Sequence, residues 1–179
     1  MWAAQVRRTA FSLRSTHGCD FLALYIIIAI LIVALDQITK VLSVSFLAPY
    51  EVKLIIPHIL SLTPVRNEGA AFGILQGARV FFIILTVAVL LLAIIYIIKI
   101  RPESRLERLS LCFIAGGAVG NFIDRVFLGY VRDFIMVEFI DFPVFNIADC
   151  FVCIGAGLYV LYAFSDIFSK KGTDASNEQ

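Results

Sequence analysis

The sequence predicts an integral membrane protein, an all-α bundle of four transmembrane helices. Hydrophobic residues make up 60% of the chain and charged residues 16%, whereas soluble domains average about half and about a quarter. The mean hydropathy is +0.92. Four long apolar stretches follow one another along 179 residues, enough for one domain. So much apolar surface cannot be hidden in a water-facing fold of this size.

The apolar stretches set the four predicted spans. A membrane-spanning helix needs about 20 predominantly apolar residues. Only the second stretch meets that length without a charged residue, and the other three include one at an end. Charges inside membrane helices are costly and mark functional positions. The predicted spans are residues 21–46, 80–98, 106–125 and 147–168.

Basic residues predict the orientation of the helices. Lys and Arg precede the first stretch, fill the loop between the second and third, and follow the fourth. These segments should share the cytoplasmic side, which places both termini inside. Residues 1–20 are then a cytoplasmic extension and 169–179 a cytoplasmic tail. The first stretch is longer than a signal-peptide core and no small-x-small cleavage site follows it, so we expect a retained helix.

The connections outside the membrane are expected to be structured. Residues 50–66 alternate polar and apolar side chains around Pro57, which predicts a hairpin or small sheet. Residues 67–76 are expected to form a short helix. Residues 126–146 interleave acidic with apolar side chains, as in a strand or flap lying on the membrane surface.

Two segments carry the same Asn-x-x-Asp pattern, Asn121 with Asp124 and Asn146 with Asp149. Residues three apart share one face of a helix, so each carboxylate is expected to have a hydrogen-bonding carboxamide beside it. Asp124 follows Arg108 by 16 residues, roughly 24 Å of helix. Asp149 precedes Asp166 by 17 residues, roughly 26 Å. Both carboxylates should therefore lie near the outer boundary of the membrane.

Two carboxylates in one low-dielectric site do not both ionise easily, so one keeps a proton. The ionised group can then take a proton from water while the protonated group polarises a carbonyl. The pair Asp124 and Asp149 is thus predicted to hydrolyse peptide bonds, without a metal or cofactor. Gly116 and Gly120 form G-x-x-x-G, which lets helices approach closely and would bring the two carboxylates together.

Asp36 and Lys40 are an acid–base pair one turn apart on the first helix. Mutual neutralisation at the helix end is the simpler interpretation, and a Ser–Lys nucleophile from Lys40 and Ser43 is the weaker alternative. Arg125, next to Asp124, can pair with a carboxylate or a lipid phosphate, and the sequence does not separate these.

The sequence lacks the signatures of several other classes of function. The net charge of +1 gives no basic surplus for nucleic acid. Neither H-E-x-x-H, the motif of metallopeptidases, nor G-x-S-x-G, the motif of Ser-His hydrolases, occurs. Cys150 and Cys153 form a lone C-x-x-C within an apolar stretch, where small helix residues are the simpler interpretation.

Taken together, the motifs resemble lipoprotein signal peptidase, or signal peptidase II. The matching segments span about residues 21–168, nearly the whole chain, and they are Asp36-Gln-Ile-Thr-Lys40, Asn67-Glu-Gly-Ala-Ala-Phe-Gly73, Gly116-Gly-Ala-Val-Gly-Asn-Phe-Ile-Asp-Arg125, Val131-Arg-Asp-Phe134 and Phe142-Pro-Val-Phe-Asn-Ile-Ala-Asp149. Two departures are a longer N-terminus and Cys150, where the family often has Ser.

The resemblance implies an aspartic endopeptidase of the bacterial inner membrane. It would remove the signal peptide from diacylglyceryl-modified prolipoproteins, just before the lipidated cysteine. It implies Asp124 and Asp149 as the catalytic dyad, and a small extracytoplasmic β-cradle with a short periplasmic helix. It also implies prolipoprotein and membrane lipid as partners, with no nucleic acid and no obligate protein partner. The remaining active-site positions that it implies are Asn67, Gly69, Asn121, Arg125, Asn146, Asp36 and Lys40.

Two other classes of protein account for fewer features. A proton-coupled transporter would spread acidic residues through the membrane, whereas Asp36, Asp124 and Asp149 are predicted at one end. A non-enzymatic helix-bundle adaptor gives no reason for the paired Asn-x-x-Asp segments.

Overall fold

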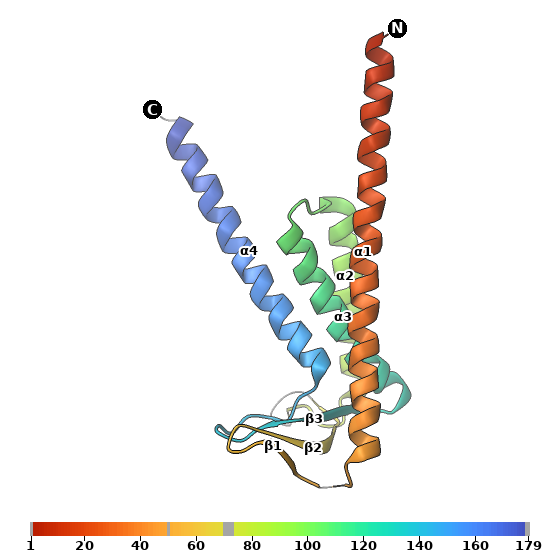
Figure 1. The fold of residues 1–179 in the computed structure, drawn as a ribbon, viewed down its shortest axis with the longest axis vertical. Coiled ribbons are helices and arrows are strands. Elements are labelled where there is room, and N and C mark those ends of the chain that lie inside the picture. Colours follow the sequence, from red (N-terminus) through yellow and green to blue (C-terminus); the bar gives the residue numbers. More distant parts are fainter. Residues whose placement is uncertain (1, 50, 70–73, 178–179) are drawn as a thin grey trace.

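The computed structural model describes the backbone of residues 2–49, 51–69 and 74–177, and the side chains of those from 23 to 168 (Figure 1). Within these ranges the chain forms four long helices and a three-stranded sheet. The N-terminal end of the first helix and the C-terminal end of the last lie at the same end of the bundle but apart from each other, and the sheet lies at the other end. The predicted fold class is confirmed.

The helices are α1 (Trp2–Phe46), α2 (Arg79–Ile100), α3 (Arg105–Phe127) and α4 (Ile147–Asn177). Each contains a segment long and apolar enough to cross a membrane, and these segments are Ala23–Phe46, Arg79–Ile100, Arg105–Phe127 and Ile147–Phe168. Helices α1 and α4 extend beyond the predicted spans, into the predicted extension and tail. Neither flank contains proline, and a formed helix propagates readily into residues that do not break it.

Local signals set the ends of the middle helices. Helix α2 stops where Arg101 adopts the left-handed conformation at φ 53° and its N–H donates to Ile97 O. Helix α3 starts after Ser104, whose hydroxyl accepts from the N–H of Glu107. Beyond α3, Gly129 has φ 90°, a conformation that glycine adopts without strain, and the chain turns there into the sheet.

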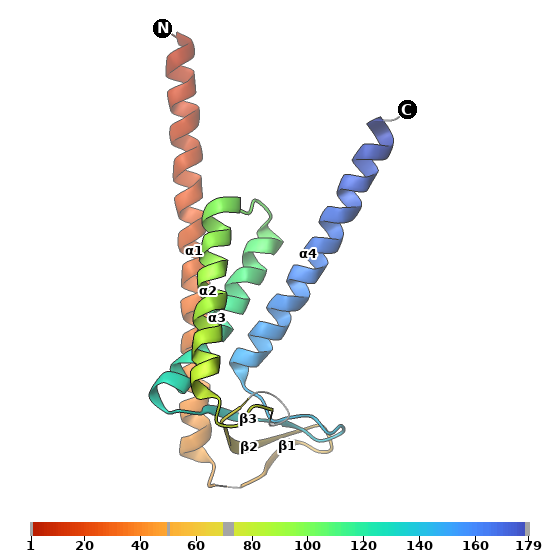
Figure 2. The ribbon, with the colours of Figure 1, turned by 180° about the vertical axis from the view of Figure 1, so that it is seen from behind.

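The sheet consists of β1 (Lys53–Ile56), β2 (Leu60–Asn67) and β3 (Val131–Val137), antiparallel in that order. It lies across the ends of the helices (Figure 2). Residues 126–146 were expected to form a strand or flap lying on the membrane surface. Within them, β3 is the third strand of the sheet, because it pairs with β2 from Leu60↔Val137 to Asn67↔Val131.

The short helix predicted over residues 67–76 is not seen in the part of it that the structure describes. Asn67 ends β2, residues 68–69 form a bend and residues 74–77 a turn. Residues 70–73 lie outside the described residues. Asn67 is held in the sheet by its pairing with Val131, so a helix cannot begin there.

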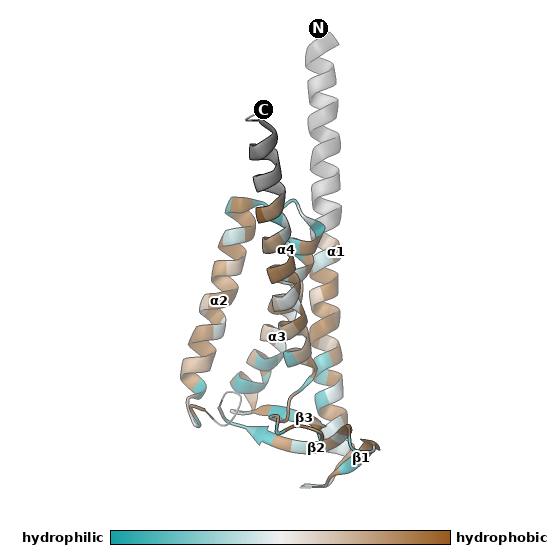
Figure 3. Ribbon diagram, turned by 90° about the vertical axis from the view of Figure 1, so that its left-hand side faces the viewer, coloured by the Kyte–Doolittle hydropathy of each residue, from teal (hydrophilic) through white to brown (hydrophobic). Residues whose placement is uncertain are grey.

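The buried and exposed residues are distributed as in a membrane protein. The transmembrane segment of α2 has no buried residue, and its surface is apolar along most of its length (Figure 3). Hydrophilic residues gather where α1 and α3 approach the sheet. The polar and charged residues that are buried are Asp36, Lys40, Ser43, Ser61, Thr63, Glu107, Ser110, Asp124, Asp133 and Asn146.

Helix α3 packs against the other three helices, and its glycines permit close contact. A Cβ on Gly116 would lie 3.0 Å from Ile32 of α1. A Cβ on Gly117 would lie 2.4 Å from the carbonyl oxygen of Ala148 in α4. The close approach predicted from Gly116 and Gly120 is confirmed, because a Cβ on Gly120 would lie 2.5 Å from the Asp36 side chain of α1 and 3.2 Å from Ala148 of α4.

Candidate active site

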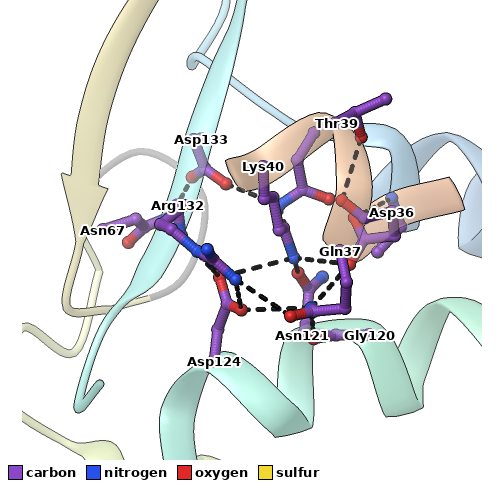
Figure 4. A network of polar contacts seen from close by, with 12 residues as sticks. Asp36, Gln37, Thr39, Lys40, Asn67, Gly120, Asn121, Asp124, Arg132 and Asp133 are labelled. Atoms are coloured by element: carbon purple, nitrogen blue, oxygen red, sulfur yellow. Dashed lines mark hydrogen bonds and ion pairs between the residues drawn. The ribbon is translucent and has the colours of Figure 1, made fainter. Parts of the chain in front are cut away.

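A polar network lies where α1, α3, the start of α4 and the strands β2 and β3 meet (Figure 4). Figure 4 shows Asp36, Lys40, Asn121, Asp124 and Asp133 converging from three different elements. Burial of ionisable groups is costly unless they are paired and hydrogen bonded. The partners of each carboxylate therefore indicate what it can do.

Asp36 and Lys40 form the part of the network that belongs to α1. Both are fully buried, and Lys40 Nζ lies 2.9 Å from Asp36 Oδ2. Lys40 Nζ also donates to Asn121 Oδ1 at 2.8 Å. Asp36 Oδ1 accepts from the N–H of Ala148 at 2.9 Å, a backbone donor in the first turn of α4 that has no intrahelical partner. The pair thus connects α1 to α3 and α4.

Asp124 of α3 is occupied by basic groups. Arg132 Nη2 lies 2.7 Å from its Oδ1, and Arg132 Nε donates to its Oδ2 at 3.1 Å. The backbone N–H of Arg132 also donates to Oδ2 at 3.0 Å, and Gln37 Nε2 donates to Oδ1 at 3.1 Å. Lys40 Nζ is 3.6 Å away. The hydrogen bond to Asp124 raises the pKa of Arg132 above its ordinary value.

Asp149 lies in the first turn of α4, where local sequence positions it. The N–H of Asn146 donates to Asp149 Oδ2 at 3.1 Å, and the N–H of Asp149 donates to Asn146 Oδ1 at 3.0 Å. This reciprocal pair is the capping box expected when a polar residue precedes a helix and an acid follows three residues later. Asp149 Oδ1 accepts from Asn121 Nδ2 at 2.8 Å.

Asp133 of β3 is the third buried carboxylate of the site, 3% exposed. Asn146 Nδ2 donates to its Oδ1 at 2.6 Å, and Asn67 Nδ2 donates to its Oδ2 at 2.8 Å. Burial raises the pKa of Asp133 to about 6, and the nearby negative charge of Asp149 adds to the rise. Asp133 can therefore hold a proton near neutral pH.

Arg125 and Gly69 border the network on one side. Arg125 Nη2 donates to Gly69 O at 3.2 Å, and its guanidinium lies 4.8 Å from the ring centroid of Phe82. The N–H of Gly69 in turn donates to Asn67 Oδ1 at 3.0 Å. Hydrogen bonds thus connect Arg125 to Gly69, Gly69 to Asn67, and Asn67 to Asp133.

All nine predicted site residues belong to one region, but their pairings differ from the prediction. The carboxamide of Asn121 was expected to serve Asp124, and it donates instead to Asp149. Among the described residues, Asp124 and Asp149 share no hydrogen-bond partner, whereas Asp133 and Asp149 share Asn146. The assignment of Asp124 and Asp149 as the dyad stays a prediction.

Sequence reasoning did not select Arg132, Gln37 or Asp133 as site residues. Two signals were available. Arg132 and Asp133 are adjacent charges in an otherwise apolar strand, Gln37 follows Asp36, and all three lie in segments that resemble the family. Within the described residues, no group of three or more His, Cys, Asp or Glu side chains is placed to hold a metal ion. The expectation of a metal-free and cofactor-free reaction stays a prediction.

Buried carboxylates at the end of a membrane-helix bundle mark a functional site, as in a membrane enzyme. The chain resembles two solved structures, each a bacterial membrane enzyme determined by the in meso method. One, at 2.3 Å resolution, has a TM-score of 0.80 and 38% identity over 84% of this chain and 93% of the other. The second, at 1.9 Å, has a TM-score of 0.76 and 38% identity over 82% and 96%.

The named relatives of the chain are lipoprotein signal peptidases. The lipoprotein signal peptidase of Enterococcus faecalis is 41% identical over 157 residues, which cover 87% of this chain and 98% of that protein. The lipoprotein signal peptidase of Brevibacillus brevis is 45% identical over 142 residues, 79% and 95% of the two chains. The family described as signal peptidase (SPase) II matches residues 28–165.

The chain belongs to the signal peptidase II family. It is accordingly an aspartic-type membrane peptidase, and a multi-pass protein of the bacterial inner membrane.

Proposed function

We propose that this peptidase removes the signal peptide from diacylglyceryl-modified prolipoproteins, cleaving just before the lipidated cysteine. The relatives are named lipoprotein signal peptidases, and the carboxylates lie where the helices meet the sheet. A lipidated cysteine is held at the membrane surface by its acyl chains. A carboxylate pair near the end of a membrane bundle can reach the peptide bond beside that lipid.

The pair that we propose for catalysis is Asp133 and Asp149, which revises the sequence-based choice of Asp124. One observation carries this proposal: Asn146 donates hydrogen bonds to both carboxylates, from its side chain to Asp133 and from its backbone to Asp149. Asp124 instead accepts hydrogen bonds from Nε and Nη2 of Arg132. A carboxylate in such an ion pair is a poor proton acceptor and cannot serve as an acid.

The chemistry follows from the two environments. Asp149, ionised, takes a proton from a water molecule as the water oxygen attacks the scissile carbonyl carbon. Asp133, protonated, donates a hydrogen bond to the carbonyl oxygen and gives up its proton as the tetrahedral intermediate forms. Asp149 then passes its proton to the leaving amine, the C–N bond breaks, and Asp133 recovers a proton from the collapsing intermediate. Protons and electrons balance, and both carboxylates return to their starting states.

Asp124 acts as a positioning residue in this proposal. It holds Arg132 by side chain and backbone, and Arg132 precedes Asp133 in β3. Lys40 and Asp36 complete the support from α1. We further propose that both termini are cytoplasmic, that the carboxylates face the periplasm, and that the enzyme works as a monomer. The basic residues flanking the helices support this orientation.

The test uses purified protein in detergent with two prolipoprotein substrates, one diacylglyceryl-modified and one with an unmodified cysteine. We expect cleavage of the modified substrate alone, with the lipidated cysteine as the new N-terminus by mass spectrometry. Asp149→Asn should abolish cleavage while preserving the thermal transition. Equal cleavage of both substrates, or an active Asp149→Asn enzyme, would contradict the proposal.

A further inference from the structure

A second polar cluster lies at the end of the bundle away from the aspartates. Glu107, in the first turn of α3, is 2% exposed. Tyr96 of α2 donates a hydrogen bond to Glu107 Oε1 at 2.5 Å. From α4, Tyr159 interacts electrostatically with Tyr96, and Tyr162 with Glu107. One carboxylate and three phenol rings from three helices therefore meet in one place, which we call the inner cluster.

The N-terminal cap of α3 does not use the carboxylate of Glu107. The cap of α3 uses the backbone N–H of Glu107, which donates to Ser104 Oγ at 3.5 Å. The salt bridges among the described residues involve Asp36, Lys40, Asp124 and Arg132, and none includes Glu107. Buried carboxylates in proteins are normally paired with a cation. The inner cluster thus presents a buried acid without a basic partner in the described chain.

The surroundings of Glu107 suit an organic cation. Tyrosine rings attract ammonium and guanidinium groups through their π faces, more strongly away from water. The same end of the bundle already holds such a contact, since the Arg108 guanidinium lies 5.5 Å from the ring centroid of Tyr25. A carboxylate beside three phenols would accept a Lys or Arg side chain, or the amine of a lipid headgroup.

The distance to the reaction site favours the substrate as the source of that cation. Asn121, which contacts Asp149, lies 14 residues along α3 from Glu107, about 21 Å. A signal peptide has an apolar core of 7–15 residues preceded by a positively charged segment. A core of about 12 helical residues spans about 18 Å, so a substrate cleaved beside Asp149 places its basic segment near Glu107.

We propose that the inner cluster binds the basic N-terminal segment of the signal peptide, with Glu107 as the countercharge and the tyrosines as the cation-binding wall. This inference depends on the proposed function of the chain. Such a contact is remote from the reacting bond and is made equally in the ground and transition states, so it lowers KM and leaves kcat unchanged. Anionic lipid headgroups would neutralise the exposed basic residues at this end of the bundle, which are Lys99, Arg101 and Arg105.

The experiment compares two diacylglyceryl-modified substrates that differ only in their N-terminal segment, one with two lysines and one with glutamines in their place. Each is cleaved by the wild-type enzyme and by Glu107→Gln, in a detergent free of ethanolamine lipids so that no lipid amine competes. We expect the wild type to show a KM about tenfold lower for the lysine substrate, which corresponds to about 1.4 kcal/mol. Glu107→Gln should lose that preference and cleave the glutamine substrate as the wild type does.

Each outcome decides the inference. A lysine preference that survives in Glu107→Gln would overturn it, and so would a wild type without any preference. If Glu107→Gln does not fold, Tyr162→Leu removes one ring of the cation-binding wall and keeps an apolar side chain. Tyr162→Leu should then weaken the lysine preference and leave cleavage of the glutamine substrate in place, and an unchanged lysine preference would count against the inner cluster. If the wild type cleaves neither substrate, the proposed function itself fails, which is a distinguishable result.

Discussion

Replacing Arg132 by glutamine should destabilise the fold through Asp124. The substitution removes two charge-assisted hydrogen bonds to Asp124, Nη2 to Oδ1 at 2.7 Å and Nε to Oδ2 at 3.1 Å, and a third hydrogen bond from Nη2 to Gln37 Oε1 at 2.9 Å. Asp124 is fully buried, whereas the Arg132 side chain is 15% exposed. Breaking a buried pair costs about 3–5 kcal/mol. Because Lys40 remains 3.6 Å from Asp124, we expect the lower end, about 3 kcal/mol.

The assay is thermal unfolding in detergent, followed by circular dichroism. For a chain of this size each kcal/mol shifts Tm by about 2–4 °C, so the expected loss for Arg132→Gln is about 6–12 °C. The matched control is Arg66→Gln, since Arg66 is the sheet partner of Arg132 and is exposed. We expect a shift of less than about 2 °C there, because surface substitutions rarely exceed about 0.5 kcal/mol.

Two results would refute this reasoning. The first is an Arg132→Gln shift no larger than that of Arg66→Gln. The second comes from the double variant with Asp124→Asn: if the two residues stabilise the fold through their contact, the double variant should lose clearly less than the sum of the single losses. Additive losses would mean that Arg132 acts through other contacts.

Four further predictions concern the site and the packing of α3 against α4. Because Asp133 must carry a proton and its pKa is about 6, kcat/KM should fall as pH rises through about 6, and a flat profile from pH 5 to 8 would contradict the acid role. The raised pKa of Asp133 also makes the free energy of unfolding depend on pH. The stabilisation from protonated Asp133 is fully present below its unfolded pKa near 4, and about 3 kcal/mol of it is lost as pH rises through 6. The free energy of unfolding of the wild type, measured against that of Asp133→Asn, should show this loss. Asn67→Ala removes a hydrogen bond that lowers the pKa of Asp133, so the falling limb should move to higher pH, and a downward move would exclude that contact. Gly117→Ala should lower Tm and activity together because its Cβ would meet Ala148 O at 2.4 Å, whereas Gly157→Ala, with open space around it, should leave both unchanged.

The helices and the position of Asp149 could be predicted from sequence because both depend on local signals. Apolar stretches of about 20 residues correspond to spans. Asn146 and Asp149, three residues apart, form the capping box at the start of α4, and the geometry of a capping box is fixed within one helical turn. The glycine contacts of α3 were likewise predictable, since small residues four apart on a membrane helix are typical of a close helix contact.

The division of roles among the acids could not be predicted, because it depends on contacts between distant elements. The two Asn-x-x-Asp segments look equivalent in the sequence. They differ because the chain turns at Gly129 and brings Arg132 back onto Asp124, while β3 pairs with β2 and carries Asp133 to Asn146. Spacing alone does not show which arginine, Arg125 or Arg132, makes that return.

The assignment of the catalytic pair is tested most directly by the turnover of three single variants on a diacylglyceryl-modified prolipoprotein, each first shown to have a cooperative thermal transition. We predict that Asp133→Asn and Asp149→Asn each lose at least about 10³-fold in kcat, the scale of a general acid or base. Asp124→Asn should have a lower Tm yet keep measurable turnover per folded molecule. An inactive, folded Asp124→Asn beside an active Asp133→Asn would contradict the assignment of Asp133 and return the dyad to Asp124 and Asp149.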